Sequence, residues 1–128
     1  MRGKIKWLKQ IKKKNCGQLA VAMVTGKSIE KVENYFGHDH GTKSKDLAAA
    51  LKHFGFSCSN RLLVMKERPI CAIAKLKYPS KSGWHWVVVY KDKIYDGVWG
   101  QPDGTVEWPR GAKLTSYIPI EAKNVRQK

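Results

Sequence analysis

Apolar side chains recur at helical spacing through the first half of the chain. The first predicted helix starts at Cys16, with Asn15 at the N-cap position and Gly26 as its stop. Its apolar face carries Leu19, Ala20, Met23 and Val24. A second helix is predicted from Ser28 to Gly37, with apolar positions at Ile29, Val32, Tyr35 and Phe36. A third is predicted to begin at Thr42 as its cap and to close at Gly55, with apolar positions at Leu47, Ala50, Leu51 and Phe54.

After Gly55 the pattern changes to short apolar runs typical of strands. The predicted strands are residues 61–64, 70–76, 85–90 and 93–95, with weaker candidates at 105–108 and 114–118. Asp92 lies in a tight connection, so the two strands around it are expected to pair as a hairpin. Helices followed by an antiparallel sheet give an α+β fold class.

The length of the chain predicts the number of domains, and its charge indicates the kind of partner. The chain of 128 residues suits one domain, residues 1–128, with a basic arm at 1–14 and a polar tail at 120–128. Its 25 Lys and Arg against 10 Asp and Glu give a net charge of +15. Such a surface favours acidic partners and weak, nonspecific nucleic-acid binding. The basic N-terminus lacks the apolar run of a signal peptide, and no stretch is long enough to span a bilayer, so we expect a cytoplasmic protein without membrane insertion.

The three cysteines are an odd set without metal-ligand spacing. An odd count argues against a disulfide framework and favours a reducing compartment. Cys58 and Cys71 are interpreted as core residues. His53 is interpreted as structural or exposed. His38, Asp39 and His40 lie too close together for good zinc geometry and have no evident third ligand, so they are interpreted as a solvated loop and no metal is expected.

Cys16 differs from the other cysteines because it starts a helix. Orphan backbone amides at a helix N-terminus stabilise a thiolate, and an adjacent imidazolium does the same. His85, at the start of a predicted central strand, can be that imidazolium, and Asp96 can orient it. The Cys16 amide and the Gln10 side chain are candidate donors to an oxyanion. Trp84 and Trp86 should point to the face opposite His85, into the core or toward a substrate cleft.

Five segments together resemble the bacteriocin-processing, double-glycine leader peptidases and their stand-alone relatives in the papain-like superfamily. They are Gln10 to Gly17, residues 42–56, residues 68–73, residues 85–89, and Tyr95 with Asp96. The resemblance implies a papain-like fold with Cys16 as nucleophile, His85 as general base and acid, and Asp96 as the orienting group. It also implies Gln10 as the oxyanion-hole glutamine, no cofactor, and a polypeptide substrate cut after a Gly-Gly pair.

The sequence departs from that family at two positions beside the triad. Asn15 replaces the usual Asp before the nucleophile, and Gly97 replaces the usual Pro after the triad aspartate. The chain also has no transmembrane or ATPase part of a transporter. These departures leave the triad intact, but they weaken the inference that this chain shares the substrate of the family.

Three functions are therefore weighed. The first is a cysteine peptidase that cuts a peptide or isopeptide bond through an acyl-enzyme. The second is a catalytically idle papain-like binding module, and the third is a basic nucleic-acid-binding protein. The complete set of Gln10, Cys16, His85 and Asp96 favours the first, because the third rests on charge and stacking side chains without a base-reading motif.

Overall fold

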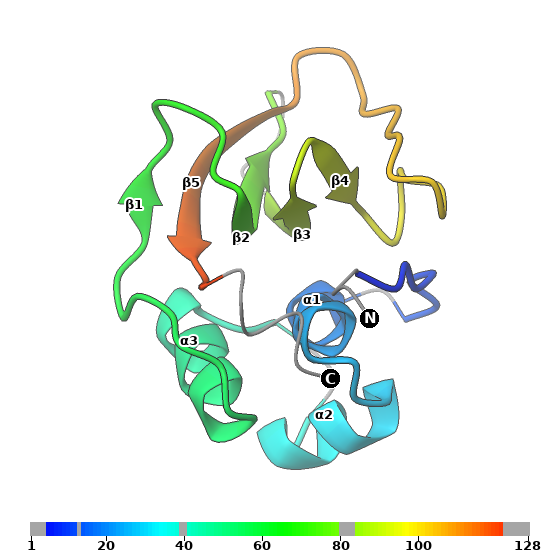
Figure 1. The fold of residues 1–128 in the computed structure, drawn as a ribbon. Helices are drawn as coiled ribbons and strands as arrows, with labels where there is room; N and C mark the ends of the chain where they lie inside the picture. The colour runs from blue at the N-terminus through cyan, green and yellow to red at the C-terminus, as the bar shows by residue number, and fades with distance from the viewer. Residues whose placement is uncertain (1–4, 13, 39–40, 80–83, 122–128) are drawn as a thin grey trace.

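Helices and sheet form two separate layers (Figure 1). The computed structural model describes residues 5–12, 14–38, 41–79 and 84–121. Within these residues lie the helices α1 (Cys16–Thr25), α2 (Ile29–Phe36) and α3 (Ser44–His53). They are followed by the strands β1 (Leu63–Val64), β2 (Cys71–Lys77), β3 (Trp84–Tyr90), β4 (Lys93–Tyr95) and β5 (Lys113–Pro119). The predicted α+β order is confirmed.

The ends of the helices follow local chemistry. Gly26 and Gly37 end α1 and α2 in the left-handed conformation, at φ 77° and 82°. Ser28 caps α2, since its Oγ accepts from the Lys31 amide at 3.1 Å. The predicted ends at Gly26 and Gly37 and the predicted start of α2 after Ser28 are confirmed.

Thr42 does not cap α3, so that prediction is wrong. Lys43 is the N-cap residue, and the Asp46 carboxylate accepts from the Lys43 amide at 3.0 Å. Thr42 is buried instead, and its carbonyl accepts from the Trp86 indole N–H at 3.4 Å. Its hydroxyl lies against Gly17, where any Cβ would overlap it. Packing of Thr42 against α1 therefore replaces the capping role.

The strands form one antiparallel sheet in the order β1-β5-β2-β3-β4. β2 lies at its centre, where Ile73 pairs with Val88 of β3 and Ile118 of β5. Tyr90 pairs with Lys93, so Lys91 and Asp92 form the tight turn of the predicted β3–β4 hairpin. The hairpin is confirmed.

Residues 105–108 do not form the predicted strand. Only an isolated bridge pairs Val106 with Gly100, within the long connection from β4 to β5. This segment instead packs its side chains on the sheet. Trp99, Val106 and Trp108 lie against Ala74, Leu76, Val87, Val89 and Ile94.

The main core fills the space between the helices and the other face of the sheet. α1 supplies most of its helical part, including Leu19, Val21 and Met23, and β3 faces it with Trp86, Val88 and Tyr90. Nearly all of α1 is buried, because it lies between the other two helices and the sheet. A buried central helix gives its first residue a fixed position against β3.

Candidate active site

Cys16 is the first residue of α1 and is half-buried. The helix begins there as predicted, so Cys16 lies at the end of α1 where backbone amides have no partner within the helix. Asn15 occupies the N-cap position, but its side chain makes no capping hydrogen bond. The side-chain Nδ2 of Asn15 instead donates to the Glu33 carboxylate of α2 at 2.9 Å. Asn15, the residue before Cys16, is therefore hydrogen-bonded to α2 rather than to its own helix.

His85 and Asp96 form a buried pair across the β3–β4 hairpin. His85 Nε2 lies 2.7 Å from Asp96 Oδ1, and the exposed fractions of the two side chains are 7% and 0%. His85 is the second residue of β3, and Asp96 follows the last residue of β4. The antiparallel hairpin thus returns the carboxylate to the histidine.

The charges of this pair reinforce each other. Burial, the largest single effect, disfavours a charged His85 ring. Its hydrogen bonds to Asp96 and Cys16, with the charges of both, outweigh burial and raise the pKa of His85 from 6.5 to about 9. Burial also opposes ionisation of Asp96, but the hydrogen bond and charge of His85 and two backbone amides lower the pKa of its carboxyl. The His85 ring therefore interacts with both the Cys16 thiol and the Asp96 carboxylate.

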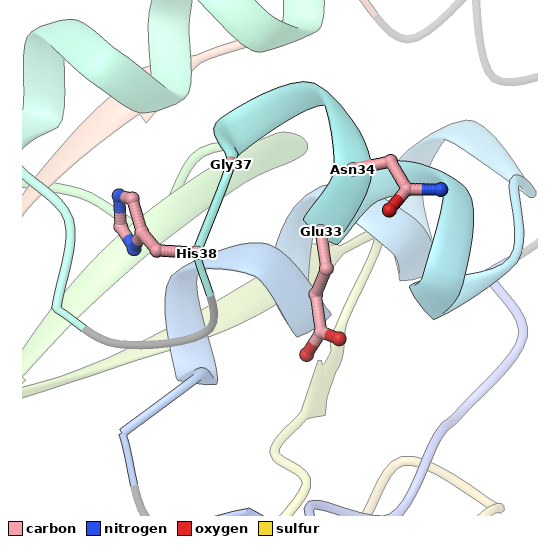
Figure 2. Close-up of a pocket in the computed structure, with 4 residues that line it drawn as sticks. All are labelled: Glu33, Asn34, Gly37 and His38. Atoms are coloured by element: carbon pink, nitrogen blue, oxygen red, sulfur yellow. The ribbon is translucent and has the colours of Figure 1, made fainter.

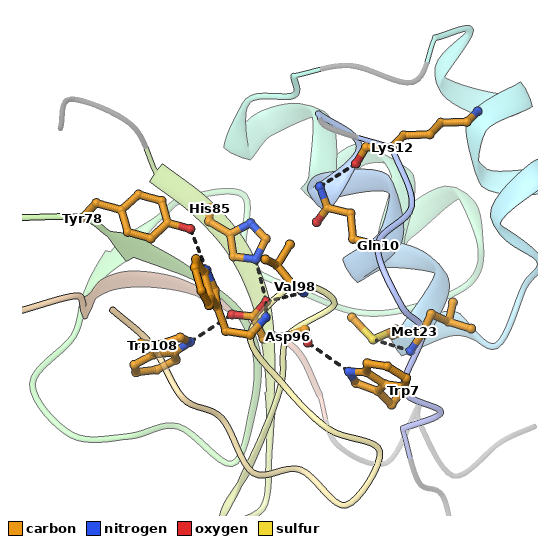
Figure 3. Close-up of polar contacts among 11 residues, drawn as sticks. Trp7, Gln10, Lys12, Met23, Tyr78, His85, Asp96, Val98 and Trp108 are labelled. Atoms are coloured by element: carbon orange, nitrogen blue, oxygen red, sulfur yellow. Dashed lines mark hydrogen bonds and ion pairs between the residues drawn. The ribbon is translucent and has the colours of Figure 1, made fainter. Parts of the chain in front are cut away.

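The Asp96 carboxylate is fully enclosed by donors (Figure 3). Oδ1 also accepts from the backbone amides of Val98 and Trp99 at 2.9 and 3.1 Å. Oδ2 accepts from the indole N–H of Trp108 at 2.9 Å. Such a set of donors holds a buried carboxylate ionised and in one rotamer.

The N-terminal arm is docked on the Asp96 loop. The Trp7 indole donates to the Asp96 carbonyl at 2.9 Å, and the Gln10 amide donates to the Gly97 carbonyl at 2.8 Å. A Cβ at Gly97 would lie 2.5 Å from Leu19 and 3.0 Å from the Leu8 carbonyl, so only glycine permits this approach. The departure from proline at this position therefore has a steric reason in this chain. The described part of the arm, residues 5–12, docks without forming a strand.

Gln10 lies on the part of the N-terminal arm that precedes α1, and Figure 3 shows its side chain turned toward Lys12. Its side-chain Nε2 donates to the Lys12 carbonyl at 2.9 Å. One side-chain N–H of Gln10 is therefore used in a hydrogen bond within the N-terminal arm. Its role as an oxyanion donor stays a prediction.

Three aromatic residues at this site were not singled out for it by the sequence. Tyr78, after β2, accepts the Trp99 indole N–H at 3.0 Å, and its pKa is raised by burial and by the charges of Asp96 and Cys16. Trp108 donates directly to Asp96. The sequence does contain an unusual number of tryptophans for its length, five in 128 residues. It does not show which groups their indole N–H donors reach, because those partners depend on the tertiary fold.

The remaining cysteines and His53 follow their structural interpretations. Cys71 is buried, which raises the pKa of its thiol to about 12, and burial also raises the pKa of Cys58. His53 is exposed and stacks on Tyr35, with ring centroids 4.4 Å apart. A thiol whose pKa is raised by burial is a poor nucleophile, which agrees with a structural interpretation of Cys58 and Cys71.

The two tryptophans beside His85 have different surroundings. Trp86 is 2% exposed and belongs to the main core, as predicted. Trp84 is 40% exposed and lies edge-on to Trp86, with Lys75 above both rings. Trp84 is therefore the one of the pair that is accessible to a ligand.

A cavity of about 370 Å³ lies at the end of α2, lined by Glu33, Asn34, Gly37 and His38 (Figure 2). Its lining does not include Cys16, His85 or Asp96. Both carboxylate oxygens of Glu33 are engaged, one by Asn15 and one by Lys12 at 3.0 Å. The lining of this cavity therefore excludes Cys16. One of its residues, Glu33, holds the side chain of Asn15, which precedes Cys16.

Neither a cluster of metal ligands nor a membrane-spanning helix is found among the described residues. Within it, no three His, Cys, Asp or Glu side chains gather closely enough to hold a metal ion. Asp39 and His40 of the predicted loop lie outside the described residues. Across those same described segments, each helix is too short or too polar to cross a bilayer.

The sequence model of the Peptidase C39 family matches residues 4–99. The match contains Gln10, Cys16, His85 and Asp96 and ends before the segment that carries Trp108. No curated protein matches the chain.

Proposed function

Because the chain belongs to the Peptidase C39 family, which has a papain-like fold, we propose that it is a cysteine peptidase that uses Cys16, His85 and Asp96 as its catalytic triad. The observation that carries the proposal is the buried hydrogen bond of 2.7 Å between His85 and Asp96. The Cys16 thiol also acts on the same histidine, since it contributes to the raised pKa of His85. A family match alone would be equally compatible with an idle relative. A complete and connected triad favours an active enzyme.

In this mechanism His85 holds the proton of the Cys16 thiol, which leaves a thiolate beside an imidazolium. The raised pKa of His85, about 9, supports the charged form of the ring at neutral pH. The thiolate attacks the carbonyl carbon of a peptide or isopeptide bond. His85 then gives its proton to the leaving amine, and the acyl group remains on the sulfur as a thioester.

Water completes the cycle. His85, now neutral, accepts a proton from the attacking water, and the carboxylic acid leaves as the Cys16 sulfur is released. The oxyanion of each tetrahedral intermediate is stabilised by the backbone amide of Cys16 and by Gln10. Asp96 keeps Nε2 of His85 occupied, so that the other ring nitrogen faces the sulfur.

The substrate is proposed to be a polypeptide, with a Gly-Gly pair before the cleaved bond as the first sequence to test. The net charge of +15 favours acidic segments in such a substrate through long-range attraction.

The test is cleavage of a proteome-derived peptide library, with new N-termini identified by mass spectrometry. We expect the wild-type protein to generate termini that are absent with Cys16→Ala and present with Cys58→Ala, the matched control. Cleavage that persists in Cys16→Ala would refute the proposal. An uncut library, together with a Cys16 that reacts no faster than Cys58 with iodoacetamide, would favour the idle binding module.

A further inference from the structure

The two oxygens of the Asp96 carboxylate are held by different parts of the chain. Oδ1 accepts from His85 and from two amides of its own loop, at 2.7 to 3.1 Å. Oδ2 accepts from Trp108 Nε1 at 2.9 Å. Among the described residues, Trp108 is the only side chain other than His85 that donates to this carboxylate. The carboxylate itself is 0% exposed.

A buried carboxylate oxygen without a donor is strongly disfavoured, and protonation or rotation of the group relieves it. Either response would disturb the bond from Oδ1 to His85, because the two oxygens share one rotatable group. The ionisable groups that interact with Asp96 are His85 and, through its charge, Tyr78. Of these only His85 hydrogen-bonds the carboxylate, so Trp108 is the partner that can hold Oδ2.

Trp108 is well fixed for this task. Its ring packs on the second face of the sheet beside Ala74, Leu76 and Val87. The segment before it is tied to the Asp96 loop, since the Glu107 amide donates to the Trp99 carbonyl at 3.0 Å. A ring held on two sides presents its N–H in a fixed direction, which is what orientation of a catalytic group requires.

We propose that Trp108 is a positioning residue of the active site, whose indole N–H holds Asp96 ionised and in the rotamer that orients His85. The inference rests on the proposed function, because it assumes that His85 serves Cys16. It places part of the active-site machinery beyond residues 4–99, the span that matches the family.

The test is the rate of Cys16 alkylation by iodoacetamide as a function of pH, measured by peptide mapping. The fold holds the pKa of Asp96 low, so the oriented site persists as pH falls until this carboxyl is protonated. Trp108→Phe removes one stabilising donor, and we expect the acidic limb of the profile to move up by about one pH unit, a tenfold loss of rate on that limb. Trp99→Phe is the matched control, since its indole N–H goes to Tyr78 and its backbone amide remains.

A second variant separates the hydrogen bond from packing. Replacement of Trp108 by its benzothiophene analogue keeps the ring shape and removes only the N–H, and we expect the same upward shift. The inference is overturned if the profile of this variant matches wild type, or if Trp99→Phe shifts it equally. A wild-type Cys16 that reacts no faster than Cys58 overturns the proposed function, and this inference with it, before any variant is compared.

Discussion

Replacing Asp96 by asparagine removes one charge from the centre of the site and changes its shape little. The carboxylate accepts four hydrogen bonds, from His85, Val98, Trp99 and Trp108. An asparagine that keeps its oxygen toward the first three must turn its NH₂ group toward the Trp108 N–H. Two donors then face each other in a buried position, which costs about 1–3 kcal/mol.

The second effect of Asp96→Asn appears in the pH dependence of stability. The pKa of His85 is raised from 6.5 to about 9, so its contribution is complete below pH 6.5 and is lost as pH rises through about 9. A difference of that size corresponds to about 3 kcal/mol. Without the aspartate charge, burial dominates and the pKa of His85 should fall below its ordinary value. The variant should therefore lack the alkaline loss of stability that wild type shows.

The assay is urea unfolding at several pH values, with the His85 ring titrated by NMR. We expect wild type to lose about 3 kcal/mol between pH 6.5 and 9, and Asp96→Asn to be less stable at neutral pH with a flat profile. Asp92→Asn, at the exposed hairpin turn, is the control for a simple change of net charge. A wild-type profile that is flat over this range, or a His85 that titrates near 6.5 in wild type, would refute the reasoning.

Three further outcomes are expected. In brief labelling near neutral pH, iodoacetamide should modify Cys16 first, and equal labelling of Cys58 and Cys71 in the folded protein would contradict its activation by His85. Gln10→Ala should lower turnover of a cleaved peptide by about a hundredfold with little change in KM, whereas full turnover would leave the oxyanion to backbone amides. Binding to DNA or RNA, measured by fluorescence titration at two salt concentrations, should be weak and steeply salt-sensitive; tight, sequence-dependent binding at high salt would favour a nucleic-acid-binding function instead.

The local elements could be predicted from the sequence because their signals are local. The glycines after α1 and α2, Ser28 before α2, and the alternation along β3 each act over a few residues. The starts of α1 and β3 then position Cys16 and His85. Gln10 was a candidate oxyanion donor from its place upstream of Cys16 and from the family resemblance, and its role stays a prediction.

What could not be predicted depends on contacts between distant segments. Thr42 has the chemistry of a cap but is used as packing against Gly17. Trp108 was assigned to a strand because alternation in a short segment does not distinguish a paired strand from a loop that packs on a sheet. The indole N–H of Trp108 reaches Asp96 only when that loop folds over the hairpin. Hydrogen-bond partners of this kind leave no periodic trace in the sequence.

The bond from Trp7 to the Asp96 carbonyl joins residues 89 positions apart. Contacts of such long range form late in folding, because closing a large loop costs entropy before the contact stabilises it. The arm that leads into Cys16 therefore reaches the Asp96 loop only after the helices, the sheet and the hairpin have assembled. A chain still emerging from the ribosome, or one that has partly unfolded, would hold a thiol without its oriented histidine. The proposed peptidase activity would then depend on the finished fold, and not on the thiol and its helix alone.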